Sequence, residues 1–241
     1  MLVSLPTSVS EVRERLAEGA VPIGGATLVW AGWQRDGFPE QAVSLRELPE
    51  ARVIGPRTLG SAVLLHQIDD RVPEVLRRAA ASIGTGAVRR TATVGGNLVG
   101  STLRCLLPAA IVLDARAAVL DARHAYETDL TELLIKRPLL VALHWRTPLV
   151  SSYRKLSGEA GGPPPLVVAC AVHAGSDGGP AELRVAVRDG YDVSAGSTAV
   201  TGPADAILDA LSRTDLGALP AEARDEVRER VTGILDGLAE R

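Results

Sequence analysis

The stretch RTATVGGNL, residues 90–98, is the most informative part of this sequence. Two successive glycines let backbone N–H groups crowd around an anion, because no Cβ blocks the approach. The side chains of Thr93 and Asn97 can add a hydroxyl and an amide to such a site. The stretch therefore predicts either a seat for a phosphate group or a tight turn with left-handed backbone angles, and it favours neither by itself.

A second glycine segment, PIGGATL at residues 22–28, lies between an expected strand at 21–23 and an expected helix at 27–34. Strand-to-helix turns direct N–H groups and the positive end of the helix dipole at whatever binds there. Close packing of a helix on a strand explains the segment equally well. Two such segments in one chain favour a long anionic ligand such as a dinucleotide.

Other motifs are incomplete or missing. GTGAVR, residues 84–89, imitates GxGxxG only in part, because Arg89 replaces the third glycine and a helix rather than a strand precedes it. The sequence has no P-loop, HExxH or GxSxG motif. Cys105, Cys170 and four scattered histidines offer no metal-ligand set, so we expect no metal. No convincing acid–base pair occurs, and catalytic residues stay unassigned.

The composition limits the possible partners. Of 241 residues, 46% are hydrophobic and 23% charged, which is ordinary for a globular protein. A net charge of −3 and 3% aromatic residues give no reason to expect nucleic acid. The sequence contains no run of 18 apolar residues and no signal-peptide pattern, so we expect a cytoplasmic protein that does not engage a membrane. Lys136 and Lys155 are the only lysines among 26 basic residues, a bias typical of GC-rich bacterial genomes.

Periodicity and turn signals predict an α+β fold. We expect a small α/β lobe at 1–55, a second lobe at 56–148, and a C-terminal unit of three antiparallel strands and helices at 149–241. The expected helices are 9–18, 27–34, two between 58 and 84 (the second at 73–83), 103–113, 204–211 and 221–238. The expected strands are 21–23, 42–45, 52–55, 117–121, 139–145, 150–156, 166–172 and 183–187.

The order of five segments resembles the FAD-binding subunit of the molybdenum hydroxylases. The segments are PIGGATL (22–28), VRRTATVGGNL (88–98), LLPAAIVLDA (106–115), SSYRKLS (151–157) and PPPLVVACAV (163–172). That family includes the medium subunit of carbon monoxide dehydrogenase and the flavin domain of xanthine dehydrogenase. The likeness spans nearly the whole chain, and the TVGGN loop is its most specific part.

The resemblance implies a two-lobed FAD-binding domain of the vanillyl-alcohol oxidase and CO dehydrogenase flavoprotein type at 1–148, followed by a CO dehydrogenase flavoprotein-like domain at 149–241. It implies FAD as the cofactor, with the pyrophosphate held between two loops. Lys155 matches the family's lysine near the flavin, although an ordinary solvent-facing strand lysine is as good an interpretation. The residues implied for the first loop are Ile23, Gly24, Gly25, Ala26, Thr27 and Leu28, and those for the second are Thr93, Gly95, Gly96 and Asn97.

The family's role would be to pass electrons from molybdenum-binding and [2Fe–2S] partner subunits through flavin to an acceptor. This sequence departs from the family at Cys105, where an acidic residue is common. Two alternatives stay open: a stand-alone FAD-dependent oxidoreductase of secondary metabolism acting on a small molecule, and a relic of the fold that binds a ligand without catalysis.

Overall fold

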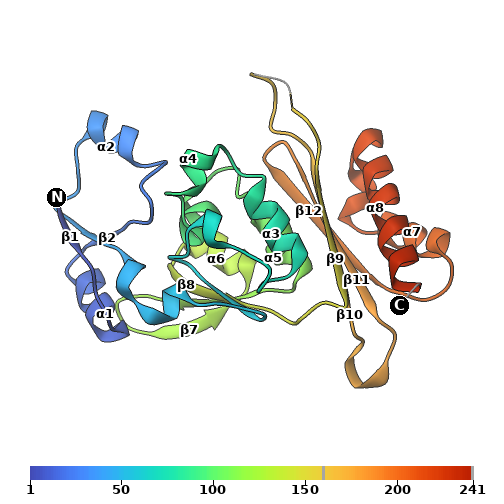
Figure 1. The fold of residues 1–241 in the computed structure, drawn as a ribbon, viewed down its shortest axis with the longest axis horizontal. Helices are drawn as coiled ribbons and strands as arrows, with labels where there is room; N and C mark the ends of the chain where they lie inside the picture. Colours follow the sequence, from blue (N-terminus) through green and yellow to red (C-terminus); the bar gives the residue numbers. More distant parts are fainter. Residues whose placement is uncertain (159–160, 240–241) are drawn as a thin grey trace. The chain divides into compact units, whose positions relative to one another are not determined.

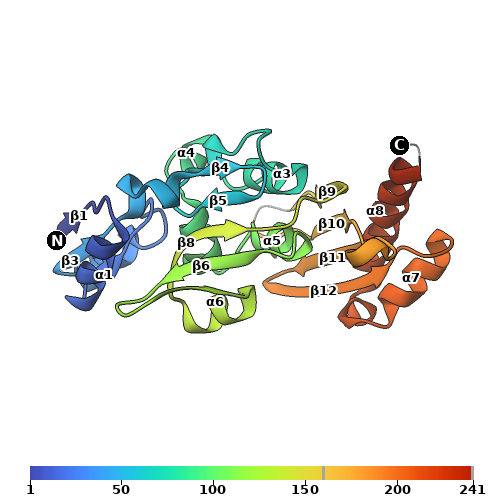
Figure 2. The same ribbon diagram turned by 90° about the horizontal axis from the view of Figure 1, so that it is seen from below.

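The structure, a computed structural model, describes residues 1–158 and 161–239 (Figure 1, Figure 2). The chain forms two compact units. The first comprises residues 1–72, 83–106 and 115–145, and the second comprises 73–82, 107–114 and 146–241. The lobe and domain boundaries expected at residues 55 and 148 stay predictions.

The first unit begins with a small parallel sheet in the order β1-β3-β2. Helix α1 (Val9–Ala17) begins where predicted, because the Ser8 side chain accepts a hydrogen bond from the Glu11 N–H. Its Val12 packs into a core with Leu45 and Leu48. Helix α2 (Trp30–Asp36) contributes no buried residue. The strands are β1 (Leu2–Ser4), β2 (Val21–Pro22) and β3 (Gln41–Val43), and short 3₁₀ helices follow at Leu45–Glu47 and Pro49–Arg52.

A five-stranded antiparallel sheet forms the rest of the first unit, in the order β4-β5-β8-β6-β7. Helix α6 (Leu130–Lys136), capped by the Asp129 carboxylate, lies beside β6 (Figure 2). The strands are β4 (Ile54–Gly55), β5 (Thr58–Gly60), β6 (Arg116–Leu120), β7 (Ala125–Thr128) and β8 (Leu139–His144). The remaining helical segments are a 3₁₀ helix at Leu65–Gln67, α4 (Gly86–Arg89) and a π-helix at Gly96–Gly100.

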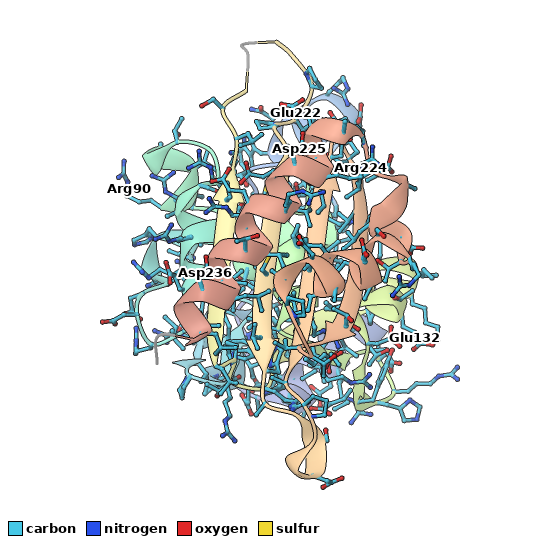
Figure 3. The ribbon with its side chains drawn as sticks, turned by 90° about the vertical axis from the view of Figure 1, so that its right-hand side faces the viewer. Arg90, Glu132, Glu222, Arg224, Asp225 and Asp236 are labelled. Atoms are coloured by element: carbon cyan, nitrogen blue, oxygen red, sulfur yellow. The ribbon has the colours of Figure 1, made fainter. Side chains whose placement is uncertain are left out.

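The second unit is built on a four-stranded antiparallel sheet in the order β12-β11-β10-β9. Helices α3 (Glu74–Ala81) and α5 (Leu107–Val112) pack on one face, and α7 (Ala204–Ser212) and α8 (Ala221–Ala239) on the other. Because both faces are covered, β10 (Val167–His173) is buried at every position. Figure 3 shows α8 running across the strands with the charged side chains of Glu222, Arg224, Asp225 and Asp236 directed away from them. The other elements are β9 (Val150–Lys155), β11 (Glu182–Asp189), β12 (Asp192–Ala199) and 3₁₀ helices at Ser176–Gly178 and Asp215–Ala218.

The α+β fold class is confirmed, and the three strands expected after residue 148 are all present. A fourth strand, β12, was missed because DVSAGSTA is small and polar. It pairs with β11 through a two-residue turn at Gly190 and Tyr191, in which Gly190 has a φ of +58°.

Several expected elements were wrong. Of the two helices expected between residues 58 and 84 only α3 forms, and β5 and a 3₁₀ helix occupy the place of the other. The helix expected from residue 27 begins at Trp30, and that expected from residue 103 begins at Leu107. No helix was expected between residues 84 and 102, where α4 and the π-helix form. Strands β1 and β7 and helix α6 were missed because segments of three to seven residues are too short to establish a period.

Candidate functional site

The two glycine loops lie in direct contact within the first unit. A Cβ added to Gly24 would meet the side chain of Thr93, and a Cβ added to Gly25 would meet the backbone carbonyl of Thr91, both well inside the 3.0 Å that real Cβ atoms respect. Only glycine permits this approach. The structure therefore brings together two loops that the sequence separates by about 70 residues.

The first loop, residues 23–28, presents unused backbone donors. The Ile23 N–H donates to the carbonyl of Val43 at 2.9 Å, which extends the pairing of β2 with β3. Among the residues that the structure describes, none accepts a hydrogen bond from the N–H groups of residues 24–28. Ala26 has a φ of +56°, and a left-handed residue within a turn makes neighbouring N–H groups converge. Five successive N–H groups are thus available to an anion.

The second loop, residues 93–97, uses its backbone donors internally. Neither Gly95 nor Gly96 has a positive φ, so the left-handed turn, one of the two interpretations of this stretch, does not form. Gly95 has helical angles and Gly96 begins the π-helix. The N–H groups of residues 94–97 all donate within the same unit. The pairs are Val94 to the Val63 carbonyl (3.0 Å), Gly95 to the Ser61 carbonyl (2.8 Å), Gly96 to Thr93 Oγ1 (3.1 Å) and Asn97 to the Thr93 carbonyl (3.0 Å).

The two polar side chains of the second loop are buried. Asn97 Oδ1 accepts a hydrogen bond from the Leu106 N–H at 2.9 Å, so this amide braces the segment 98–106. Thr93 Oγ1 accepts from Gly96 and lies beside Gly24. A hydroxyl that accepts one hydrogen bond still has its own proton to donate. Thr93 is therefore the second-loop side chain best placed to serve both the loop and a ligand.

Arg104 was missed by the sequence analysis, and its backbone is unusual. Its φ of +41° is a backbone conformation that non-glycine residues seldom adopt. Its Nε is buried, and among the described residues it has neither a hydrogen-bond acceptor nor an ion-pair partner. Burying a cationic nitrogen without a partner is costly, so this position favours an anionic ligand. The sequence signal that could have identified Arg104 is its position next to Cys105, where the family commonly has an acidic residue.

Lys155 belongs to the second unit, on β9, whereas both glycine loops belong to the first. Its ammonium donates to the Ser82 carbonyl at the end of α3 at 2.8 Å. The Tyr153 hydroxyl lies 3.0 Å from Ser82 Oγ. Lys155 is thus half-buried and anchors a helix terminus rather than simply facing solvent.

Buried ionisable groups of the second unit offer no evident acid–base chemistry. Burial raises the pKa of the Cys170 thiol to about 12, which keeps it protonated. Burial also lowers the pKa of His173, although the hydrogen bond between its Nε2 and the Val112 carbonyl at 2.8 Å partly opposes this. Across residues 1–158 and 161–239, no three His, Cys, Asp or Glu residues cluster as metal ligands would. No helix in the described part is long and apolar enough to cross a membrane.

Solved structures share this fold across nearly their whole chains. A chain of quinoline 2-oxidoreductase from Pseudomonas putida 86 is 17% identical with a TM-score of 0.70, and the match covers 98% of this chain and 97% of that one. A chain of reconstituted CO dehydrogenase from Oligotropha carboxidovorans is 18% identical with a TM-score of 0.73, covering 97% and 98%. A chain of carbon monoxide dehydrogenase from Hydrogenophaga pseudoflava that lacks the Mo-pyranopterin moiety is 17% identical with a TM-score of 0.65, covering 98% and 96%.

No curated protein sequence matches the chain. A family model described as the FAD-binding domain in molybdopterin dehydrogenase matches residues 2–145, more than half of the chain and a span that includes both glycine loops. The predicted cofactor, FAD, and the predicted class, an FAD-dependent oxidoreductase, are confirmed by that match. This chain therefore belongs to the family of FAD-binding domains of the molybdopterin dehydrogenases.

Proposed function

We propose that this chain is the flavin subunit of a molybdenum hydroxylase, and that it passes electrons from molybdenum-binding and [2Fe–2S] partner subunits through FAD to an acceptor. The family match supports the role of the cofactor. The similar solved chains come from enzymes that include a Cu,Mo-CO dehydrogenase, which supports the kind of partner. We also propose a cytoplasmic location, which suits a protein whose two cysteines form no disulfide.

The observation that carries the proposed FAD site is the row of N–H groups at residues 24–28, which have no acceptor among residues 1–158 and 161–239. We propose that they bind the pyrophosphate, because such N–H groups are common phosphate ligands. The second loop then acts mainly as a support, since Thr91 and Thr93 pack directly against Gly25 and Gly24. FAD, when bound, supplies the redox chemistry, and the protein supplies binding and orientation.

The proposed site also needs a positive charge, because the two loops contain no basic side chain. Arg104 is the candidate, since it follows the π-helix on the segment that Asn97 braces and its Nε has no acceptor in the described part of the chain. A guanidinium adds charge-assisted hydrogen bonds that neutral N–H groups cannot. Lys155 stays a prediction as the residue near the flavin.

The role in an assembly can be tested by purifying the affinity-tagged chain from its native cells and analysing it for flavin, molybdenum, iron and acid-labile sulfide. The electron-transfer proposal predicts that all four co-purify. A yellow chain without metals that is bleached anaerobically by a small molecule alone would support the stand-alone oxidoreductase instead. A chain that neither carries flavin nor binds added FAD would contradict both and favour the relic.

A further inference from the structure

An exposed aromatic cluster follows the first glycine loop. Trp30, Trp33 and Phe38 are three of only seven aromatic residues in the chain. Gly37, with a φ of +102°, ends α2 and turns the chain back, so that the ring of Phe38 lies 5.2 Å from Trp30 and 6.2 Å from Trp33 in edge-on contacts. Despite these contacts Trp30 is 47% exposed and Phe38 is 43% exposed.

The remainder of the first unit leaves the aromatic cluster uncovered. None of the residues of α2 is buried, and a Cβ added to Gly32 on this helix would meet nothing within 4 Å. Figure 1 shows α2 standing apart from the parallel sheet of its own unit. A helix of seven residues is too short to be stable in water by itself. Exposed aromatic rings on such an element indicate a surface that a ligand covers.

The position of the aromatic cluster in the chain indicates which ligand covers it. The first glycine loop ends at Leu28, two residues before Trp30. In FAD each of the two planar rings lies one sugar or one ribityl chain away from the pyrophosphate. The neighbouring charges, Arg35 and Asp36, pair with each other at 2.9 Å, so the cluster presents a surface suited to a flat, largely apolar ring.

We propose that the aromatic cluster stacks on one of the two ring systems of bound FAD. The proposal rests on the assignment of residues 24–28 as the pyrophosphate loop, and it makes the segment 24–38 one continuous binding element for phosphate and ring. Aromatic side chains stack on any planar base or flavin face without requiring a fixed hydrogen-bond pattern. Covering the cluster would also stabilise α2, which has little else to hold it.

The test is a set of titrations in which FAD, ADP or FMN is added to the FAD-free chain. Binding is monitored by tryptophan fluorescence and, for the two flavins, by flavin fluorescence. Trp30→Leu keeps an apolar helix former but removes the ring, and should weaken FAD binding about 5- to 100-fold, the range expected for loss of one stacking contact. Trp30→Phe should retain most of the affinity. Tyr191→Ala, which removes an exposed aromatic ring from the second unit, should bind FAD like the parent.

The two smaller ligands show which ring is involved. Weaker ADP binding by Trp30→Leu assigns the cluster to the adenine side, and weaker FMN binding assigns it to the flavin side. The proposal is overturned if Trp30→Leu and Phe38→Ala both bind all three ligands like the parent. If Gly25→Ala abolishes FAD binding while both cluster variants leave it intact, the pyrophosphate loop stands and only the stacking proposal fails. Far-UV circular dichroism of the FAD-free variants should match that of the parent, because α2 contributes no buried residue to the core of the first unit.

Discussion

The first glycine loop, residues 23–28, and the second, residues 93–97, both carry a Gly-Gly pair, but their backbone donors are in opposite states. In the first loop the N–H groups of five successive residues have no acceptor among the described residues, whereas in the second every N–H from Val94 to Asn97 is bonded within the unit. The first loop contains a left-handed residue, Ala26, and the second contains none.

This difference indicates that the two glycine loops have different roles although their sequences are similar. Gly24 and Gly25 bring the first loop onto residues 91–93, and the N–H groups of residues 24–28 have no acceptor in the described part of the chain. Gly95 instead allows close packing on Ser61, whose Cβ would lie 3.0 Å from an added Cβ. A glycine pair therefore indicates that another group comes close to the backbone. Whether that group is a ligand or part of the protein is shown by the hydrogen bonds of the surrounding backbone N–H groups.

The largest effect is expected for Gly25→Ala. The new methyl group would collide with the backbone carbonyl of Thr91, which cannot move aside as a flexible side chain could. The first loop must then shift, and we expect FAD binding to be lost from the chain. Isothermal titration with FAD measures this, with circular dichroism confirming that the fold persists.

Gly96→Ala is the matched control for the second loop. Its added Cβ would meet only Thr93 Oγ1, at 3.1 Å, and its backbone needs no positive φ. We therefore expect FAD affinity to fall by less than about tenfold, or about 1.4 kcal/mol. An equal loss of FAD affinity in the Gly25→Ala and Gly96→Ala variants would contradict the different roles of the two loops.

Removing Arg104 tests whether the site needs a charge beside its neutral donors. Arg104→Ala should weaken FAD binding by about 1.5–3 kcal/mol, the usual value of a hydrogen bond to a charged group. Arg104→Lys should recover part of that loss. The FAD affinity of the parent should also fall more steeply with rising salt concentration than the FAD affinity of Arg104→Ala. An unchanged affinity and salt response in Arg104→Ala would exclude this residue from the site.

Asn97→Ala should act on stability more than on FAD. Its Oδ1 is the acceptor for the buried N–H of Leu106, and leaving that donor unsatisfied costs about 1–3 kcal/mol of unfolding free energy. Urea unfolding of the FAD-free chain measures this directly. If instead FAD affinity fell and stability stayed constant, Asn97 would be a direct ligand, and the second loop would share the role of the first.

A smaller, pH-dependent effect on the free energy of unfolding is expected from the second unit, and it should not involve the glycine loops. Burial lowers the pKa of His173 below its ordinary value of 6.5, so the folded state binds a proton less readily than the unfolded state. Stability is then lost as the pH falls below about 6.5. His173→Gln should flatten this dependence in urea unfolding curves between pH 7 and 5. A parent-like slope in that variant would show that other groups cause the acid sensitivity.

Much of the fold followed from local signals. The spacing of Ser8 and Glu11 is typical of a helix cap and predicts the start of α1, and the helical spacing of Val227 and Val231 predicts the buried face of α8. Both glycine loops were found because paired glycines are conspicuous. Whether their backbone N–H groups have acceptors was not predictable, since two of the four acceptors of the second loop, the carbonyls of Ser61 and Val63, lie about 30 residues away in sequence. The strained backbone of Arg104 is likewise fixed by tertiary structure rather than by any local pattern.

Amide hydrogen exchange, resolved residue by residue by NMR, tests the central claim most directly. In the FAD-free chain the amides of residues 94–97 should already be protected and those of residues 24–28 should exchange rapidly, because within the described residues only the former have acceptors. Adding FAD should protect residues 24–28 and change residues 94–97 little. Rapid exchange at residues 94–97 that slows only with FAD, while residues 24–28 stay unprotected, would contradict the account.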